Sequence, residues 1–283
     1  MKQITVISGK GGTGKTVISG AFAALAEKKV MVDCDVDAAD LHLLLHPEIK
    51  ERHEFKGGQL SVIDEVKCDK CGKCAAACRF GGISPVFKVE VFSCQGCGLC
   101  SRICPRGAIR MKEKIAGEWF VSDTAYGVLV HARLGIAEDN SGRLVSRIRQ
   151  AAEKIAAAGG ADYIIIDGPP GIGCPVIASL AGTDLILVVT EPTLSGLHDA
   201  ARVIELAAHF KIPAALVVNK YDLNPGVTEK IEAFCLARNI PLTGKVPFDK
   251  TVVRAVVEGK VVTEYPGSPA AGEIRKIWDL LKD

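Results

Sequence analysis

Residues 9–16 read Gly9-Lys10-Gly11-Gly12-Thr13-Gly14-Lys15-Thr16. They follow an apolar run at 4–7 that is typical of a buried strand, and they precede residues 17–27, whose composition predicts a helix. A strand, a glycine-rich turn ending in Gly-Lys-Thr and a helix make up the phosphate-binding P-loop. In such a loop successive backbone N–H groups and the helix N-terminus face one anion. Lys15 would reach the β- and γ-phosphates, and the Thr16 hydroxyl would ligate Mg²⁺.

The same run also satisfies the pattern of a dinucleotide-binding turn. Gly9, Gly11 and Gly14 are spaced as Gly-x-Gly-x-x-Gly, and Asp33 follows at the distance of a ribose-binding acid. That site would not require Lys15 and Thr16, and it would leave the acidic motifs farther along the chain unused. The run therefore favours a nucleoside phosphate, with a dinucleotide as the competing hypothesis.

The rest of the chain predicts an α/β fold. Continuous apolar runs predict strands at 29–35, 163–167, 185–190, 214–219 and 242–246, and the segments between them, where they show helical spacing, predict helices. Strands that are apolar throughout are typical of a parallel sheet covered by helices on both faces. We expect a doubly wound P-loop NTPase sheet in residues 1–59 and 115–283, interrupted by a small α+β domain at 60–114.

Composition limits the remaining function classes. The chain has 283 residues, 48% of them hydrophobic and 24% charged, and a formal net charge of +2. No apolar run approaches the roughly 20 residues that span a bilayer, and the sequence enters the first strand directly. We expect a cytoplasmic protein without integral membrane association and without a nucleic-acid partner.

Cysteine is the unusual residue. Of the eleven cysteines, eight fall into two runs of identical spacing, Cys-x-x-Cys-x-x-Cys-x-x-x-Cys. This pattern resembles the bacterial two-cluster ferredoxins, in which the fourth cysteine of each run ligates the other cluster. The resemblance implies two 4Fe–4S clusters, one held by Cys68, Cys71, Cys74 and Cys104 and the other by Cys94, Cys97, Cys100 and Cys78. Arg79 stands where the pattern has proline. A pair of zinc knuckles is the alternative.

The inserted segment is also basic. Residues 67–114 contain ten Lys or Arg against three acids, a formal charge of +7. Part of this charge would compensate thiolate-ligated clusters, and the remainder is compatible with steering an acidic redox partner or with an ordinary solvated face.

The run containing Lys10 resembles the deviant P-loop of the MinD/ParA/Mrp-type ATPases, relatives of the nitrogenase iron protein. Four further segments carry the resemblance: Asp33-Cys34-Asp35, Asp167-Gly168-Pro169-Pro170-Gly171, Asn219-Lys220 and Pro247-Phe248-Asp249. It implies a nucleotide-dependent homodimer in which Lys10 crosses to the partner's nucleotide. Asp35 would orient the attacking water, and Asp33 and Asp167 would assist Thr16 in holding Mg²⁺. Asn219, Pro247 and Asp249 would surround the adenine of ATP or ADP.

Two further features have alternative explanations. Cys174-Pro175 resembles the start of a Cys-Pro-x-Cys cluster motif, but Ile177 leaves it incomplete, so a buried structural thiol is expected. Residues 273–281 form an amphipathic pattern, for which docking on the protein's own sheet is favoured over membrane binding.

Together these patterns predict an ATP-binding and ATP-hydrolysing iron–sulfur protein. Its nucleotide state would control electron transfer, or cluster delivery, to an unidentified redox or cluster-acceptor protein. The alternative is a MinD/ParA-type positioning ATPase with structural or sensory clusters, and a third hypothesis is a dinucleotide-dependent oxidoreductase.

Overall fold

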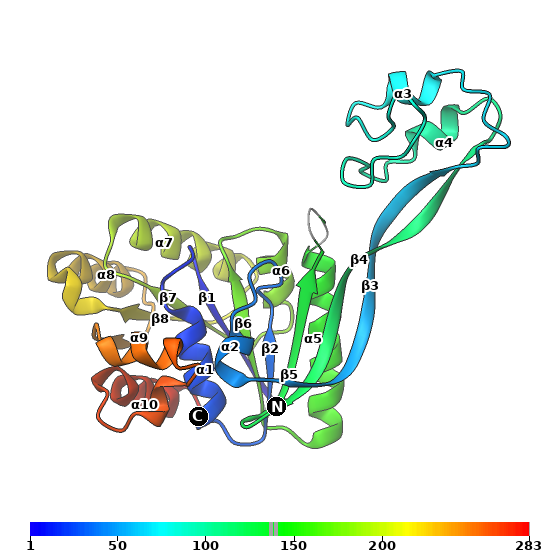
Figure 1. Ribbon diagram of the computed structural model, residues 1–283. Coiled ribbons are helices and arrows are strands. Elements are labelled where there is room, and N and C mark those ends of the chain that lie inside the picture. The colour runs from blue at the N-terminus through cyan, green and yellow to red at the C-terminus, as the bar shows by residue number, and fades with distance from the viewer. Residues whose placement is uncertain (136–137, 139–140, 283) are drawn as a thin grey trace. The chain divides into compact units, whose positions relative to one another are not determined.

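The computed structural model describes residues 1–135, 138 and 141–282, and the chain divides into two compact units (Figure 1). The first unit, called the nucleotide unit below, comprises Met1–Arg52, Trp119–Arg133 and Ser141–Asp283. The second, called the cysteine unit, comprises His53–Glu118 and Leu134–Asn140.

The described residues contain one nine-stranded sheet of order β3-β4-β5-β2-β6-β1-β7-β8-β9. From β5 to β9 every neighbouring pair is parallel, which confirms the predicted α/β fold. The strands are β1 (Lys2–Ser8), β2 (Lys29–Asp33), β3 (Glu48–Ile63), β4 (Ile109–Thr124), β5 (Gly127–Leu134), β6 (Tyr163–Pro170), β7 (Leu185–Thr190), β8 (Ala214–Asn219) and β9 (Leu242–Val246).

Strands β3, β4 and β5 were not predicted from the sequence. β3 is rich in charged and polar residues, and only three of its sixteen residues are buried, so it lacks the continuous apolar run that marks the central strands. Both β3 and β4 begin in one unit and end in the other.

Helices cover both faces of the parallel strands, as the apolar patterns predict. Alternate residues of β7 separate into two cores: Leu187 and Val189 belong to one, Ile186 and Val188 to the other. The first core includes α1 (Lys15–Leu25), α2 (Leu41–Leu45) and α10 (Pro269–Leu281). The second includes α6 (Cys174–Leu180), α7 (Leu194–His209) and α8 (Pro225–Ala237).

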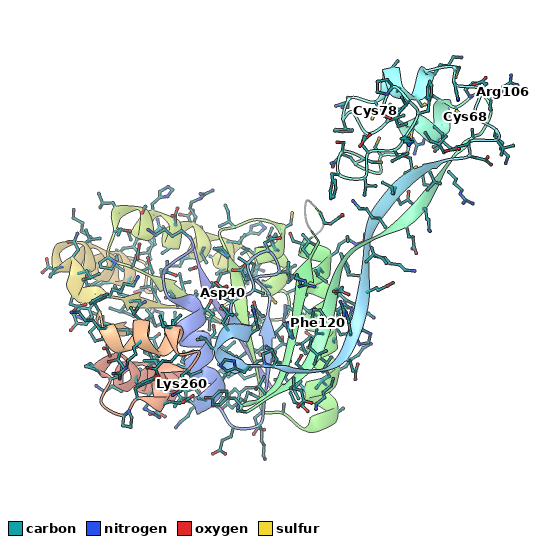
Figure 2. The ribbon with its side chains drawn as sticks, viewed as in Figure 1. Asp40, Cys68, Cys78, Arg106, Phe120 and Lys260 are labelled. Atoms are coloured by element: carbon teal, nitrogen blue, oxygen red, sulfur yellow. The ribbon has the colours of Figure 1, made fainter. Side chains whose placement is uncertain are left out.

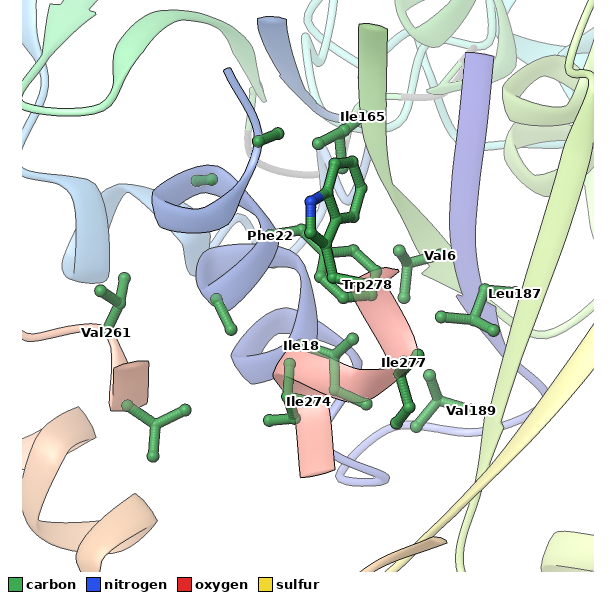
Figure 3. Close-up of a cluster of buried hydrophobic side chains, with 14 of the residues drawn as sticks. Val6, Ile18, Phe22, Ile165, Leu187, Val189, Val261, Ile274, Ile277 and Trp278 are labelled. Atoms are coloured by element: carbon green, nitrogen blue, oxygen red, sulfur yellow. The ribbon is translucent and has the colours of Figure 1, made fainter. Parts of the chain in front are cut away.

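The C-terminal helix α10 docks on the protein's own core. Trp278 packs against Phe22 of α1 with ring centroids 5.1 Å apart, and Ile274 and Ile277 lie beside it (Figure 3). Burial of side chains of this size contributes about 1.5–3 kcal/mol each. This confirms docking over a free amphipathic helix for residues 273–281.

The remaining helices complete the two units. Those of the nucleotide unit are α5 (Ser141–Gly159), α9 (Lys250–Val257) and the 3₁₀ turns η1 (Tyr221–Leu223) and η2 (Val262–Glu264). The cysteine unit holds two short helices, α3 (Lys73–Ala77) and α4 (Leu99–Ile103), around a small core of Cys74, Ile83 and Ile109.

Candidate functional site

The P-loop connects β1 to α1 and borders a pocket of about 590 Å³. Gly12 and Gly14 have φ values of 79° and 93°, which disfavour any residue with a side chain. At Gly14 an added Cβ would lie 2.2 Å from Asn219 Nδ2. The pocket is lined by Ser8, Gly11, Gly12, Thr13, Gly14, Lys15, Thr16, Val17, Asp35, Asp37, Ala38, Asp40, Leu43, Leu44, Pro169, Pro170, Pro175 and Val256.

Lys15 is the cation at the base of this pocket. Its side chain is 6% exposed, and its Nζ lies 3.2 Å from Asp167 Oδ1 and 3.5 Å from Asp35 Oδ2. Burial acts to lower the pKa of Lys15, but the charges of Asp167, Asp35 and Asp33 outweigh it and raise the pKa. The lysine is therefore held in its charged form, as phosphate binding requires.

Asp167 lies in β6, the strand that pairs with β1, and one of its carboxylate oxygens has no partner among the described residues. Its Oδ1 accepts hydrogen bonds from Lys15 Nζ and, at 2.9 Å, from Ser19 Oγ. Its buried Oδ2 has no partner within the described residues. Because Thr16 lines the same pocket and Mg²⁺ prefers oxygen ligands, these residues fit a magnesium ion. Sequence reasoning missed Ser19, although it lies one helical turn beyond Lys15 on the same face of α1.

The two acids after β2 differ in position. Asp33 is fully buried, and its carboxylate accepts the backbone N–H groups of Asp35 at 3.0 Å and Leu41 at 3.2 Å. Asp33 does not line the pocket; it anchors the loop that carries Asp35. Burial, followed by the Asp167 charge, raises the pKa of Asp33 well above its usual range.

Asp35 is the acid that faces the pocket. Burial raises its pKa, and the nearby Lys15 charge opposes the rise. Asp35 lies beside Lys15, in a loop anchored by Asp33, and its role in orienting the attacking water stays a prediction.

Lys10 points away from the pocket lining. Its Nζ forms a 2.7 Å ion pair with Glu191 Oε1 and lies 3.3 Å from Thr193 Oγ1 and 3.2 Å from Ser195 Oγ. Glu191 also lies 3.6 Å from Lys220 Nζ. The sequence analysis did not identify Glu191; its position directly after β7, at the carboxyl edge of the sheet, is the signal that was available.

Of the three residues expected to surround the adenine, Asn219 and Asp249 already form hydrogen bonds within the protein. Asn219, at the end of β8, donates from Nδ2 to the Thr13 carbonyl at 2.8 Å and so braces the P-loop. Asp249 caps α9 through Thr251 N at 2.7 Å and accepts a hydrogen bond from Ser268 Oγ. Neither of these residues nor Pro247 lines the 590 Å³ pocket.

The eight clustered cysteines lie around two further pockets, both within the cysteine unit. The first quartet, Cys68, Cys71, Cys74 and Cys104, lines one of them. The second quartet, Cys78, Cys94, Cys97 and Cys100, lines the other, which measures about 340 Å³ and also touches Cys74. Cys68, Cys78 and Arg106 are labelled in Figure 2. No group of three or more His, Cys, Asp or Glu that could hold a metal ion occurs among the described residues.

The two halves of the cysteine unit repeat the same backbone. Gly72 and Gly98 precede α3 and α4 with φ values of 78° and 74°. The last cysteine of each run accepts a backbone hydrogen bond at its sulfur, Cys78 from Gly82 N at 3.2 Å and Cys104 from Ala108 N at 3.3 Å. Hydrogen bonds of this kind surround cluster-ligating sulfurs and set their potential. The assignment of the two quartets to iron–sulfur clusters stays a prediction.

The other three cysteines lie in the nucleotide unit. Cys34 and Cys235 are buried; burial raises the pKa of Cys34 above its ordinary value and that of Cys235 to about 11. Both thiols are therefore unreactive. Cys174 is exposed as the first residue of α6, so the expectation of a buried thiol at this position is wrong.

Among the described residues, no helix has the length and apolar character needed to cross a membrane.

Residues 4–262 match the family model for the CobQ/CobB/MinD/ParA nucleotide binding domain. The chain belongs to this family, and the P-loop with its pocket is its nucleotide-binding site. An uncharacterized protein of Methanocaldococcus jannaschii, MJ0578, is 32% identical over 284 residues, covering 99% of this chain and 96% of that protein.

Two solved structures share the fold. The septum site-determining protein MinD of Pyrococcus horikoshii, complexed with Mg-ADP, matches with a TM-score of 0.60 and 18% identity, covering 99% of this chain and 95% of that one. The MinC:MinD cell division protein complex of Aquifex aeolicus gives a TM-score of 0.61 and 19% identity, covering 100% of this chain and 97% of that one. At such identities the likeness concerns the fold alone.

Proposed function

We propose that this protein is a magnesium-dependent ATPase of the MinD/ParA type, which uses the nucleotide to switch between a free form and a dimer that recruits a partner. The observation that carries the proposal is the position of Lys15, which lines the pocket with Asp35 and forms ion pairs with both Asp35 and Asp167, while Asp167 Oδ2 has no partner among the described residues. The Mg-ADP bound to the Pyrococcus horikoshii relative supports the choice of ligand.

Each residue of the site has a distinct role in ATP binding and hydrolysis. The P-loop N–H groups bind the phosphates, and Lys15 turns from the carboxylates of Asp35 and Asp167 toward the β- and γ-phosphates. Thr16 and Asp167 would hold Mg²⁺, which neutralises charge developing on the phosphates. Asp35, released from Lys15, orients the attacking water.

Lys10 supplies the dependence on a dimer. In the free protein its ammonium group is paired with Glu191, so it does not contribute to its own pocket. A second phosphate-bearing protomer offers a stronger anion, and Lys10 would exchange Glu191 for that nucleotide. A cation acting in trans in this way contributes to hydrolysis as an arginine finger does.

Family membership and the solved relatives favour this function over the redox function that the sequence analysis placed first. The relatives named above include a MinD in complex with MinC, and MinD-like switching gives roles to Lys15, Thr16 and Asp35 of the pocket. A dinucleotide-dependent oxidoreductase would leave Lys15 and Thr16 without a role.

A second candidate function rests on the cysteine unit. The two quartets expected from the ferredoxin spacing line two separate pockets, and equivalent backbone N–H groups face Cys78 and Cys104. The eight thiols match the ligands of two 4Fe–4S clusters in kind and number, although the described residues do not bring three of them together as a metal site; such clusters would supply one-electron redox chemistry. Electron transfer and cluster delivery are both compatible with this arrangement, as are structural or sensory clusters on a positioning ATPase.

Two measurements test the two functions separately. Steady-state ATP hydrolysis with and without Mg²⁺, compared between the natural protein and Lys15→Ala, tests the ATPase; unchanged hydrolysis in the variant would contradict it. Metal analysis after anaerobic purification tests the clusters. About eight irons per chain are expected for two clusters, and stoichiometric zinc with little iron would replace them with zinc sites.

A further inference from the structure

The two halves of the cysteine unit share a backbone but differ in surface. Helix α3 begins with Lys73, whereas α4 begins at the equivalent position with Leu99. In the turns that follow the last cysteine of each run, Phe80 corresponds to Arg106. The pocket of the second quartet is therefore lined by the apolar side chains of Phe80 and Leu99, whereas their counterparts Arg106 and Lys73 are cations beside the pocket of the first quartet.

The apolar pair borders the pocket of the second quartet. Phe80 and Leu99 are 45% and 44% exposed, although both line this pocket. Arg79 and Arg102 line it too and are exposed, and the Arg79 guanidinium lies 5.8 Å from the centre of the Phe80 ring. No Asp or Glu is among the lining residues, so the positive charge at this pocket is uncompensated by its own walls.

The pocket of the first quartet differs in both respects. Its lining includes the acid Asp69 beside Lys73, and Arg106 Nε forms a 3.0 Å ion pair with Asp69 Oδ2. The large apolar side chains in its lining are Phe87 and Ile109, of which the first is partly and the second fully buried. This surface is charged, internally paired and without an exposed apolar centre.

From this asymmetry we propose that Arg79, Phe80, Leu99 and Arg102 form a docking surface for an acidic electron-transfer protein, beside the second quartet. The proposal rests on the second candidate function and names the partner class for it. Aromatic and arginine side chains are the residues enriched in the centres of protein interfaces, and Phe80 and Leu99 supply the apolar area. The two arginines select an acidic surface and accelerate encounter with it.

The docking surface adjoins an exposed cysteine of the second quartet. Cys97 is the exposed member of the second quartet and lines the same pocket as Phe80 and Leu99. A cluster held by this quartet would supply one electron in each encounter, so that the acceptor would be reduced by one electron and the cluster oxidised by one.

The test uses the full chain, purified anaerobically, with an acidic flavodoxin as the one-electron acceptor. The reaction is followed by stopped-flow absorbance at low and at physiological ionic strength, and the affinity of the oxidised complex is measured by calorimetric titration. The test variant is Arg79→Glu/Arg102→Glu. The matched control, Lys70→Glu/Lys73→Glu, makes the same change in net charge beside the first quartet.

We expect the test variant to lower both the bimolecular rate and the affinity by about tenfold or more at low salt, and the control to change them by less than about threefold. Phe80→Ser should weaken the affinity at both salt concentrations, because the contact it removes is apolar. Equal effects of the two double variants, or faster reaction with basic cytochrome c than with flavodoxin, would overturn the docking surface while leaving the clusters in place. Protein without iron would refute the clusters and the docking surface together, and iron analysis of each preparation separates the two outcomes.

Discussion

Lys15→Ala removes the cation that lies between the carboxylates of Asp35 and Asp167. The lysine is 6% exposed and its Nζ is 3.2 Å from Asp167 Oδ1. Removing one partner of a buried ion pair costs about 3–5 kcal/mol, because the other charge stays buried and unpaired. Asp35 retains 16% exposure, so we expect a loss near the lower end, about 3 kcal/mol in the free energy of unfolding.

The sign of the pH dependence follows from the same contacts. Burial already raises the pKa of Asp33 and Asp35, and the Lys15 charge opposes that rise at both carboxyls. Without Lys15 the folded-state pKa values rise further above the unfolded value of about 3.9. A carboxyl with a raised folded-state pKa takes up its proton in the folded state first, so stability increases as the pH falls through that pKa. The Lys15→Ala deficit should therefore shrink from neutral pH toward pH 4.

Urea denaturation of both proteins at several pH values, without nucleotide, measures this deficit. Lys10→Ala is the matched control, because its ion pair with Glu191 joins side chains that are 31% and 20% exposed. Such a pair contributes about 0–1 kcal/mol. If the two variants lose equal stability, or if the Lys15→Ala deficit does not depend on pH, the buried-cation argument is wrong. ATP titration of the same samples should show binding only in the natural protein and in Lys10→Ala.

Three further outcomes are expected. Lys10→Ala should keep its nucleotide affinity but lose ATP-dependent dimerisation, measured by analytical ultracentrifugation. Glu191→Gln should dimerise at lower protein concentration, because the substitution releases Lys10 from its ion pair. Unchanged dimerisation in both variants would contradict an action of Lys10 in trans. Cys97→Ser should lower the iron content of the anaerobically purified protein by up to about half, because the second quartet loses one ligand. ATP binding should not change, because Cys97 lies outside the nucleotide unit. A loss of all iron would instead indicate that the two clusters assemble together. Burial, followed by the charge of His42, lowers the pKa of His131 to about 4. The free energy of unfolding of the natural protein should therefore fall by up to about 3 kcal/mol between pH 6.5 and pH 4. His131→Gln, which can still form a hydrogen bond with Ser122, should lack that contribution in denaturation curves over this range.

The sequence alone was sufficient for features whose residues are neighbours in the chain. The P-loop is continuous from Gly9 to Thr16, so its glycines and lysine specify the turn, the helix start and the anion site together. The apolar runs at 185–190 and 214–219 became β7 and β8, because strands buried on both faces must be apolar throughout. Cysteine spacing likewise predicted the grouping of eight thiols around two pockets.

Tertiary structure decided which polar groups meet across the sheet. Lys10 pairs with Glu191, and Ser19 bonds Asp167, over separations of more than a hundred residues that no local pattern encodes. These contacts depend on the order and register of β1, β6 and β7, which bring three strand ends to one edge. Asp33 and Asp35 are the same residue type only two positions apart, so the sequence does not distinguish their roles. In the structure the Asp33 carboxylate accepts backbone hydrogen bonds from its own loop, whereas Asp35 lines the pocket.

The same division holds for the cysteine unit. The repeat of its two runs is visible in the sequence, because ligand spacing is local. The sequence does not show that Phe80 and Leu99 act together, because they belong to different cysteine runs. In the structure both line one pocket, whereas their counterparts Arg106 and Lys73 do not line it. Side-chain exposure depends on the folded surface and cannot be read from the sequence. Phe80 is 45% exposed, and this exposure is the reason for placing it in the proposed docking surface rather than in a core.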